Sequence, residues 1–215
     1  TTTMIGDITV NGGGSVAGIQ LNGANNNVVT QTGDISITND GFVQKTGVFI
    51  LGNDNTINIT GDMTSKGNKV PSFRLTMGSA RNTINMTGNI TSSGDSSFGF
   101  FLDQGASSNT INMTGNISTT GDTAHGLRLS NSNSNTTNLT GNITTTGDTA
   151  FGLYLASSDS NTTNLTGNIT TTGDTAAGLR LETSDSNTTT LTGNITTTGA
   201  VAVGLDFDTS DSNTI

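Results

Sequence analysis

The chain repeats itself with a period of 26 to 28 residues. The segment NTINMTGNI occurs at Asn82–Ile90 and Asn109–Ile117, and NTTNLTGNI occurs at Asn135–Ile143 and Asn161–Ile169. One glycine marks each exact or looser copy: Gly6, Gly33, Gly61, Gly88, Gly115, Gly141, Gly167 and Gly193. Successive marker glycines are 27, 28, 27, 27, 26, 26 and 26 residues apart. A fixed period of this size is typical of solenoids, in which each repeat packs only against its neighbours.

Apolar and polar residues alternate within each repeat, and this pattern predicts β-strands. In Thr136–Thr144, Leu139 and Ile143 fall on one face, whereas Asn138 and Asn142 fall on the other. The abundant Thr, Asn, Ser and Gly are also poor residues for a helix interior. We therefore expect the first face to point into the coil and the second to point outward.

A second short alternating run begins about 11 residues after each marker glycine, as in GLRL at Gly126–Leu129. The segment TTGDTA at Thr145–Ala150 predicts the turn between the two runs. A polar stretch at Ser130–Asn135 then closes the coil. The pattern leaves open whether that stretch adds a third short strand.

These features together predict an all-β fold, a right-handed parallel β-helix or β-solenoid of about eight coils, with residues 1–215 forming a single array. Stacked coils place equivalent residues about 4.8 Å apart, so inward positions become columns. The expected columns are Met86, Met113, Leu139, Leu165 and Leu191, and Ile90, Ile117, Ile143, Ile169 and Ile195. Neither end of the chain carries a polar cap, which favours a fragment of a longer array, with head-to-tail stacking of subunits as the alternative.

Composition and charge argue against several classes of function. The net charge is −9 and the 7 Lys and Arg form no basic stripe, so nucleic acid is not an expected partner. No apolar run is long enough for a transmembrane helix, and no signal peptide opens the chain. The absence of cysteine fits a bacterial surface protein that crosses an oxidising periplasm.

Units of the form GLxL, a polar stretch, and NTxNxTGxIxTTGDTA resemble the β-helical passenger repeats of Gram-negative autotransporters. They also resemble the repeats of large bacterial surface adhesins. The resemblance covers essentially the whole chain. It implies export through an outer-membrane barrel, an extracellular or cell-surface location, and a structural or adhesive stalk. The implied partners are a host or neighbouring-cell surface, or further copies of the chain in a self-assembling filament.

Catalysis is not expected. The only histidine, His125, occupies the repeat position that holds Phe98 and Phe151 in neighbouring coils. A residue that exchanges with phenylalanine in this way is expected to fill a corner or the core. Enzymes built on β-helices use clustered acids and bases in a groove made by long loops, and the loops here are short. We predict a non-enzymatic protein with no cofactor.

Aspartates recur in the TGD turn. We expect them to cap the backbone, with calcium bridging between coils as the alternative, because a hard cation takes oxygen ligands. The calcium candidates are Asp95, Asp122, Asp148 and Asp174. The glycine- and aspartate-rich nonapeptide that binds calcium in other β-rolls is absent.

Two outward surfaces are candidates for contact with a ligand. The Thr-Asn-Thr-Asn-Thr ladder has the regular hydroxyls and methyls of an ice-binding face, although β-propensity alone accounts for it. Its N-x-T triplets also leave glycosylation open. The second surface is a variable line of outward residues where a partner could bind. The alternative is that these residues only pack laterally or are simply exposed to solvent. Its members are Arg74, Phe101, Arg128, Tyr154 and Arg180.

Overall fold

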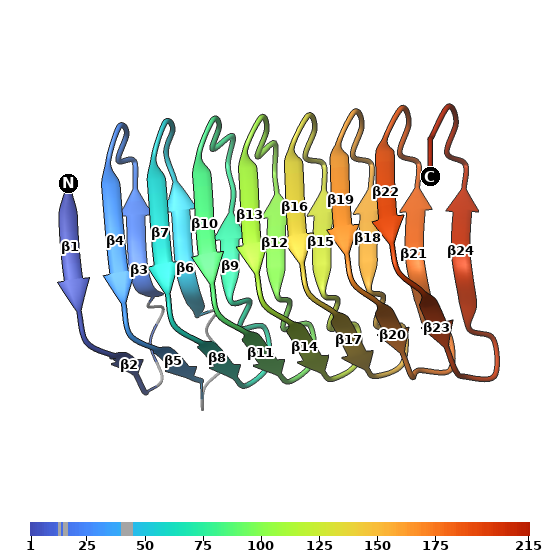
Figure 1. Cartoon of the computed structure of the whole chain (residues 1–215), viewed down its shortest axis with the longest axis horizontal. Coiled ribbons are helices and arrows are strands. Elements are labelled where there is room, and N and C mark those ends of the chain that lie inside the picture. The colour runs from blue at the N-terminus through green and yellow to red at the C-terminus, as the bar shows by residue number, and fades with distance from the viewer. Residues whose placement is uncertain (13, 15–16, 40–44) are drawn as a thin grey trace.

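The computed structural model describes residues 1–12, 14, 17–39 and 45–215, and these residues form 24 strands and no helix. The strands belong to three sheets of eight, and every pairing is parallel. Successive strands of one coil pass to the first, second and third sheet in turn, so the chain winds along the long axis in Figure 1. The predicted β-solenoid is confirmed. Its coil count is slightly lower than expected, at about 7 turns.

The first sheet, sheet A, contains β1 (Thr2–Ile5), β4 (Val28–Thr32), β7 (Thr56–Thr60), β10 (Thr83–Thr87), β13 (Thr110–Thr114), β16 (Thr136–Thr140), β19 (Thr162–Thr166) and β22 (Thr188–Thr192). The second, sheet B, contains β2 (Ile8–Val10), β5 (Ile35–Thr38), β8 (Met63–Lys66), β11 (Ile90–Ser93), β14 (Ile117–Thr120), β17 (Ile143–Thr146), β20 (Ile169–Thr171) and β23 (Ile195–Thr197). The third, sheet C, contains β3 (Ala17–Asn22), β6 (Thr46–Leu51), β9 (Phe73–Leu75), β12 (Phe100–Asp103), β15 (Leu127–Ser130), β18 (Leu153–Ala156), β21 (Ala177–Glu182) and β24 (Val203–Asp208).

The third strand of the coil comes from a break in the first predicted run. The run Thr136–Thr144 divides at Gly141 into β16 and β17. Gly141 has a φ of 145°, and a Cβ at this position would collide with the carbonyl oxygen of Gly115 in the preceding coil. The marker glycine is therefore a corner at which the backbones of neighbouring coils approach closely. The polar stretch 130–135 adds no further strand beyond the last residue of β15.

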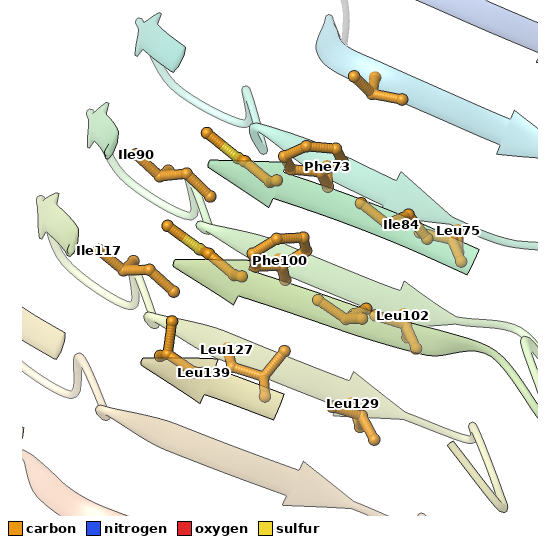
Figure 2. Packing of buried hydrophobic residues seen from close by; sticks show 14 of the residues in the cluster. Phe73, Leu75, Ile84, Ile90, Phe100, Leu102, Ile117, Leu127, Leu129 and Leu139 are labelled. Carbon is orange, nitrogen blue, oxygen red and sulfur yellow. The ribbon is translucent and has the colours of Figure 1, made fainter. Parts of the chain in front are cut away.

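The core consists of the predicted columns. Figure 2 shows Ile90 and Ile117 in one column, and Phe100 and Leu127 in another. The register keeps equivalent residues paired, because Leu139 pairs with Met113 on one side and with Leu165 on the other. All of these side chains are buried. Phe73 and Phe100 also stack, with ring centroids 4.6 Å apart.

Small hydroxyl side chains share the interior with the apolar columns. Ser65, Ser92, Thr119, Thr145 and Thr171 are fully buried in sheet B, where the sequence had predicted the start of a turn. The Thr145 hydroxyl donates to the carbonyl of Ala150 across the corner, at 2.9 Å. The Thr119 hydroxyl makes the equivalent bond to Ala124, whereas the buried Thr171 hydroxyl has no hydrogen-bond partner among the described residues.

Asparagine ladders hold the coils together at the corner between sheets C and A. The members are Asn27, Asn55, Asn82, Asn109, Asn135, Asn161, Asn187 and Asn213. The backbone N–H of each donates to the Oδ1 of the next, at 2.8–3.0 Å. The six side chains from Asn55 to Asn187 are buried. These bonds pair backbone donors that the corner would otherwise leave without a partner inside the protein.

The inward and outward assignment yields a stability prediction. Ile143→Asp should lower the free energy of unfolding by more than about 4 kcal/mol, because it buries an unpaired carboxylate in the core. Asn142→Asp should change it by less than about 1 kcal/mol, because Asp62 in the same column accepts the equivalent backbone hydrogen bond. Urea unfolding followed by circular dichroism measures both. Equal losses would mean that the facing assignment is wrong.

The corner glycines yield a second prediction. Gly141→Ala should destabilise the protein by roughly 1–3 kcal/mol, since alanine is strained at this φ and meets the backbone of the preceding coil. Gly204→Ala is the control, because its Cβ has open space and its φ lies outside the left-handed region. Its effect should be within about 0.5 kcal/mol in the same urea titration. A loss at Gly141 no larger than at Gly204 would contradict the role of the corner.

Candidate functional site

The outer face of sheet C carries a column in which rings and guanidinium groups alternate. The register pairs Phe49 with Arg74, Arg74 with Phe101, Phe101 with Arg128, Arg128 with Tyr154, and Tyr154 with Arg180. We call these six residues the cation–aromatic column. Each sits between two inward core residues of its strand, so its side chain points outward.

The members of this column contact one another. The guanidinium carbon of Arg74 lies 5.5 Å from the ring centroid of Phe101, and that of Arg128 lies 5.3 Å from the same centroid. Arg128 is also 5.5 Å from the Tyr154 ring. Each such cation–π contact contributes about 0.5–2 kcal/mol, depending on how far it is removed from water. The predicted line is therefore brought together as a stacked array.

A second column lies beside the first, at the corner between sheets B and C. Its members are Phe98, His125 and Phe151, and we call it the corner column. The His125 ring is stacked between the other two, with centroids 5.3 Å from Phe98 and 5.0 Å from Phe151. The rings also touch the cation–aromatic column, since Phe98 lies 4.9 Å from Phe101 and His125 lies 5.0 Å from Tyr154.

His125 fills space in this stack, as the sequence predicts. It is 3% exposed, and its Nδ1 accepts the backbone N–H of Phe151 at 3.0 Å. Burial, and secondarily the charge of Arg128, lowers the His125 pKa to about 3. The imidazole is thus neutral at physiological pH and one of its two nitrogens is already bonded.

Carboxylates flank two of the three arginines of the column. Arg74 forms a salt bridge to Asp103 at 2.7 Å. Arg180 contacts Asp206 at 2.9 Å, and both Asp208 and Glu182 at 3.3 Å. The Tyr154 hydroxyl donates to Glu182 at 2.6 Å, and burial followed by this hydrogen bond raises the Tyr154 pKa to about 12.

Arg128 differs from the other two arginines. It forms no salt bridge with a carboxylate of the described residues, whereas Arg74 and Arg180 each form at least one. Three rings surround it, because Phe98 also lies 5.3 Å away. Burial lowers the pKa of Arg128 below the usual arginine value, but a guanidinium remains charged at neutral pH.

The sequence did not reveal several members of this surface. Phe49 lies 25 residues before Arg74, outside the 26–28 spacing, because the early coils differ in loop length. Asp103 and Glu182 lie two positions after Phe101 and Arg180, and Asp208 lies two positions after Asp206, the register partner of Arg180. The period-2 rule places them on the same face, and that signal could have found them.

The four calcium candidates cap the backbone at the corner between sheets B and C. Asp95, Asp122 and Asp148 each accept, through Oδ1, the backbone N–H of the equivalent aspartate one coil later, at 3.0–3.1 Å. Asp174 accepts the N–H of Ala200 at 3.4 Å. No group of three or more His, Cys, Asp or Glu in the described ranges could hold a metal ion. Calcium binding stays a prediction.

The outer face of sheet A presents the threonine–asparagine array. The amide of Asn85 donates to Asn58 at 2.8 Å, and the same bond continues through Asn112, Asn138 and Asn164 at 2.9 Å. The asparagine amides thus bond along the array, between two columns of threonine. Ice binding by this face also stays a prediction.

Comparisons of the chain with protein families, with curated proteins and with solved structures give no match. Within the ranges that the structure describes, no helix is long and apolar enough to cross a membrane.

The buried histidine predicts a pH dependence. Between about pH 6.5 and pH 3 the unfolded chain binds a proton at this side chain that the folded chain does not bind, so stability falls as the pH falls. His125→Phe, which copies the neighbouring coils, should reduce the loss of unfolding free energy between pH 7 and pH 4.5 by on the order of 2 kcal/mol. Urea titrations at the two pH values measure it. Identical losses in both proteins would contradict the neutral, buried histidine.

Proposed function

We propose that this chain is a non-enzymatic, extracellular structural and adhesive stalk of a bacterial surface protein, resembling an autotransporter passenger region. The observation that carries the proposal is the unbroken register of the three sheets from the first coil to the last. Each coil is bonded to the next through all three sheets and through side-chain ladders at the corners. A rod built in this way resists bending at every level, which is what a stalk requires.

The side chains that could perform chemistry have structural partners, and this supports a non-enzymatic role. His125 is neutral and packed between rings, and the recurring aspartates bond to backbone amides of the adjacent coil. The polar outer faces also suit an aqueous, extracellular location. Thr, Ser and Asn dominate these faces, and the net charge of −9 keeps the rods apart in solution.

A self-assembling filament is the second candidate, because head-to-tail contacts between copies would bury the apolar surface of the outermost coils. Leu205 and Phe207 are 43% and 44% exposed, and an apolar hollow there is lined in part by Leu191 and Ile215. Met4, the inward side chain of the first coil that pairs with Gln31, is 42% exposed. In a stalk, further coils of the same array would cover these side chains. In a filament, the first coil of another copy would cover them.

Electron microscopy of source cells labelled with antibodies against this chain separates the two candidates. The stalk proposal expects label on thin, separate projections that end at the cell envelope. A continuous fibre with an axial period of about 38 Å, eight strands at about 4.8 Å each, would favour the filament. Label confined to the cell interior would contradict both. Beads coated with the purified protein test adhesion directly, with beads coated with the urea-unfolded protein as control.

A further inference from the structure

The three arginines of the cation–aromatic column repeat one geometric arrangement. Each arginine stands on a strand of sheet C, and the position diagonally across from it lies on the next strand, two residues beyond its register partner. For Arg74 this diagonal position holds Asp103, and for Arg180 it holds Asp208. Both positions carry a carboxylate that contacts the guanidinium, at 2.7 Å and 3.3 Å.

For Arg128 the diagonal position holds Ala156. The register pairs Arg128 with Tyr154 and Ser130 with Ala156 on the neighbouring strands β15 and β18 (Figure 1). Alanine offers no acceptor and little bulk, so the place that a carboxylate fills in the other two copies is left open beside Arg128. Ala156 is partly exposed, so this place is open to solvent.

The acidic residues nearest to Arg128 are already bonded to other side chains. Asp103, on the preceding strand, bonds to Arg74 through both carboxylate oxygens. Glu182, on the strand after Ala156, accepts the Tyr154 hydroxyl and contacts Arg180. Three rings lie within 5.5 Å of the Arg128 guanidinium carbon and its Nε is buried, so the terminal nitrogens are the part left for a ligand. A planar guanidinium edge matches a carboxylate in geometry.

We propose that Arg128 is a binding site for one carboxylate of an acidic side chain, Asp or Glu, delivered by a polypeptide partner into the space above Ala156. A side chain is favoured as the source because Asp103 and Asp208 occupy the two equivalent places in this molecule. The charges of Asp103 and Glu182 on either side disfavour ligands that bring several negative charges together. The proposal goes beyond the stalk function and does not depend on it.

The site is tested by nuclear magnetic resonance of the arginine Nε–Hε groups in the intact chain. The probe is N-acetyl-aspartate N-methylamide, titrated against chloride at constant ionic strength. The Arg128 signal should shift and saturate with a Kd on the order of 10–100 mM, as expected for one charged hydrogen-bonded pair. The Arg74 signal is the internal control and should stay in place, because Asp103 already binds that guanidinium.

Ala156→Asp should abolish the shift, because it supplies the missing carboxylate from within the chain. Ala156→Glu serves the same purpose if the first variant does not fold, since Glu182 stands in the same column. Ala156→Ser is the matched control and should retain binding. An absent shift, an equal shift at Arg74, or a shift that persists in both acidic variants would overturn the proposal. Tighter binding of glucuronate than of the aspartate probe would overturn the assignment to a polypeptide.

Discussion

The stacking of each coil on an equivalent coil, one strand spacing away, is the interaction on which the rest of the structure depends. A single coil has two or three inward side chains on each strand and cannot remove them from water alone. Stacking converts Leu139 and Ile143 into members of continuous buried columns and pairs every strand with its neighbours. The same stacking brings equivalent corners together along the rod, so the backbone bond made at Asn109 recurs at the equivalent corners of the neighbouring coils.

The corners show how the repeat satisfies the backbone. Each coil turns three times, and backbone carbonyls of the adjacent coil pair only some of the amides in the turns. Asparagine or aspartate at equivalent positions supplies the acceptor. Asn142 accepts a hydrogen bond from the backbone N–H of Asn168, and Asp122 accepts one from the backbone N–H of Asp148. The high content of Asn and Asp is therefore part of the fold, which also explains why recurring carboxylates need no metal to account for them. Gly141 also depends on this stacking, because the backbone of Gly115 in the adjacent coil lies too close for a side chain.

The outer face of sheet C follows the stacking rule but breaks the repeat. Arginine and aromatic residues alternate there, and the stacked register places the Arg128 guanidinium between the Phe101 and Tyr154 rings of the two adjacent coils. Acidic partners complete the array at Arg74 and Arg180, whereas Ala156 leaves it incomplete at Arg128. On a surface where most positions are dictated by repetition, such a departure marks the place at which a specific contact can be made.

The sequence by itself determined the class of fold, the inward columns and the outward line from Arg74 to Arg180, because period and alternation follow directly from strand geometry. It did not separate β16 from β17, since the break at Gly141 depends on the approach of Gly115 from another coil. Likewise it did not place Phe49 beside Arg74. Loops of unequal length change the number of residues between the two positions, whereas hydrogen bonding between the strands keeps them paired. Which charges pair, and which guanidinium is left open, was decided only by the tertiary structure, because diagonal contacts between strands depend on that register.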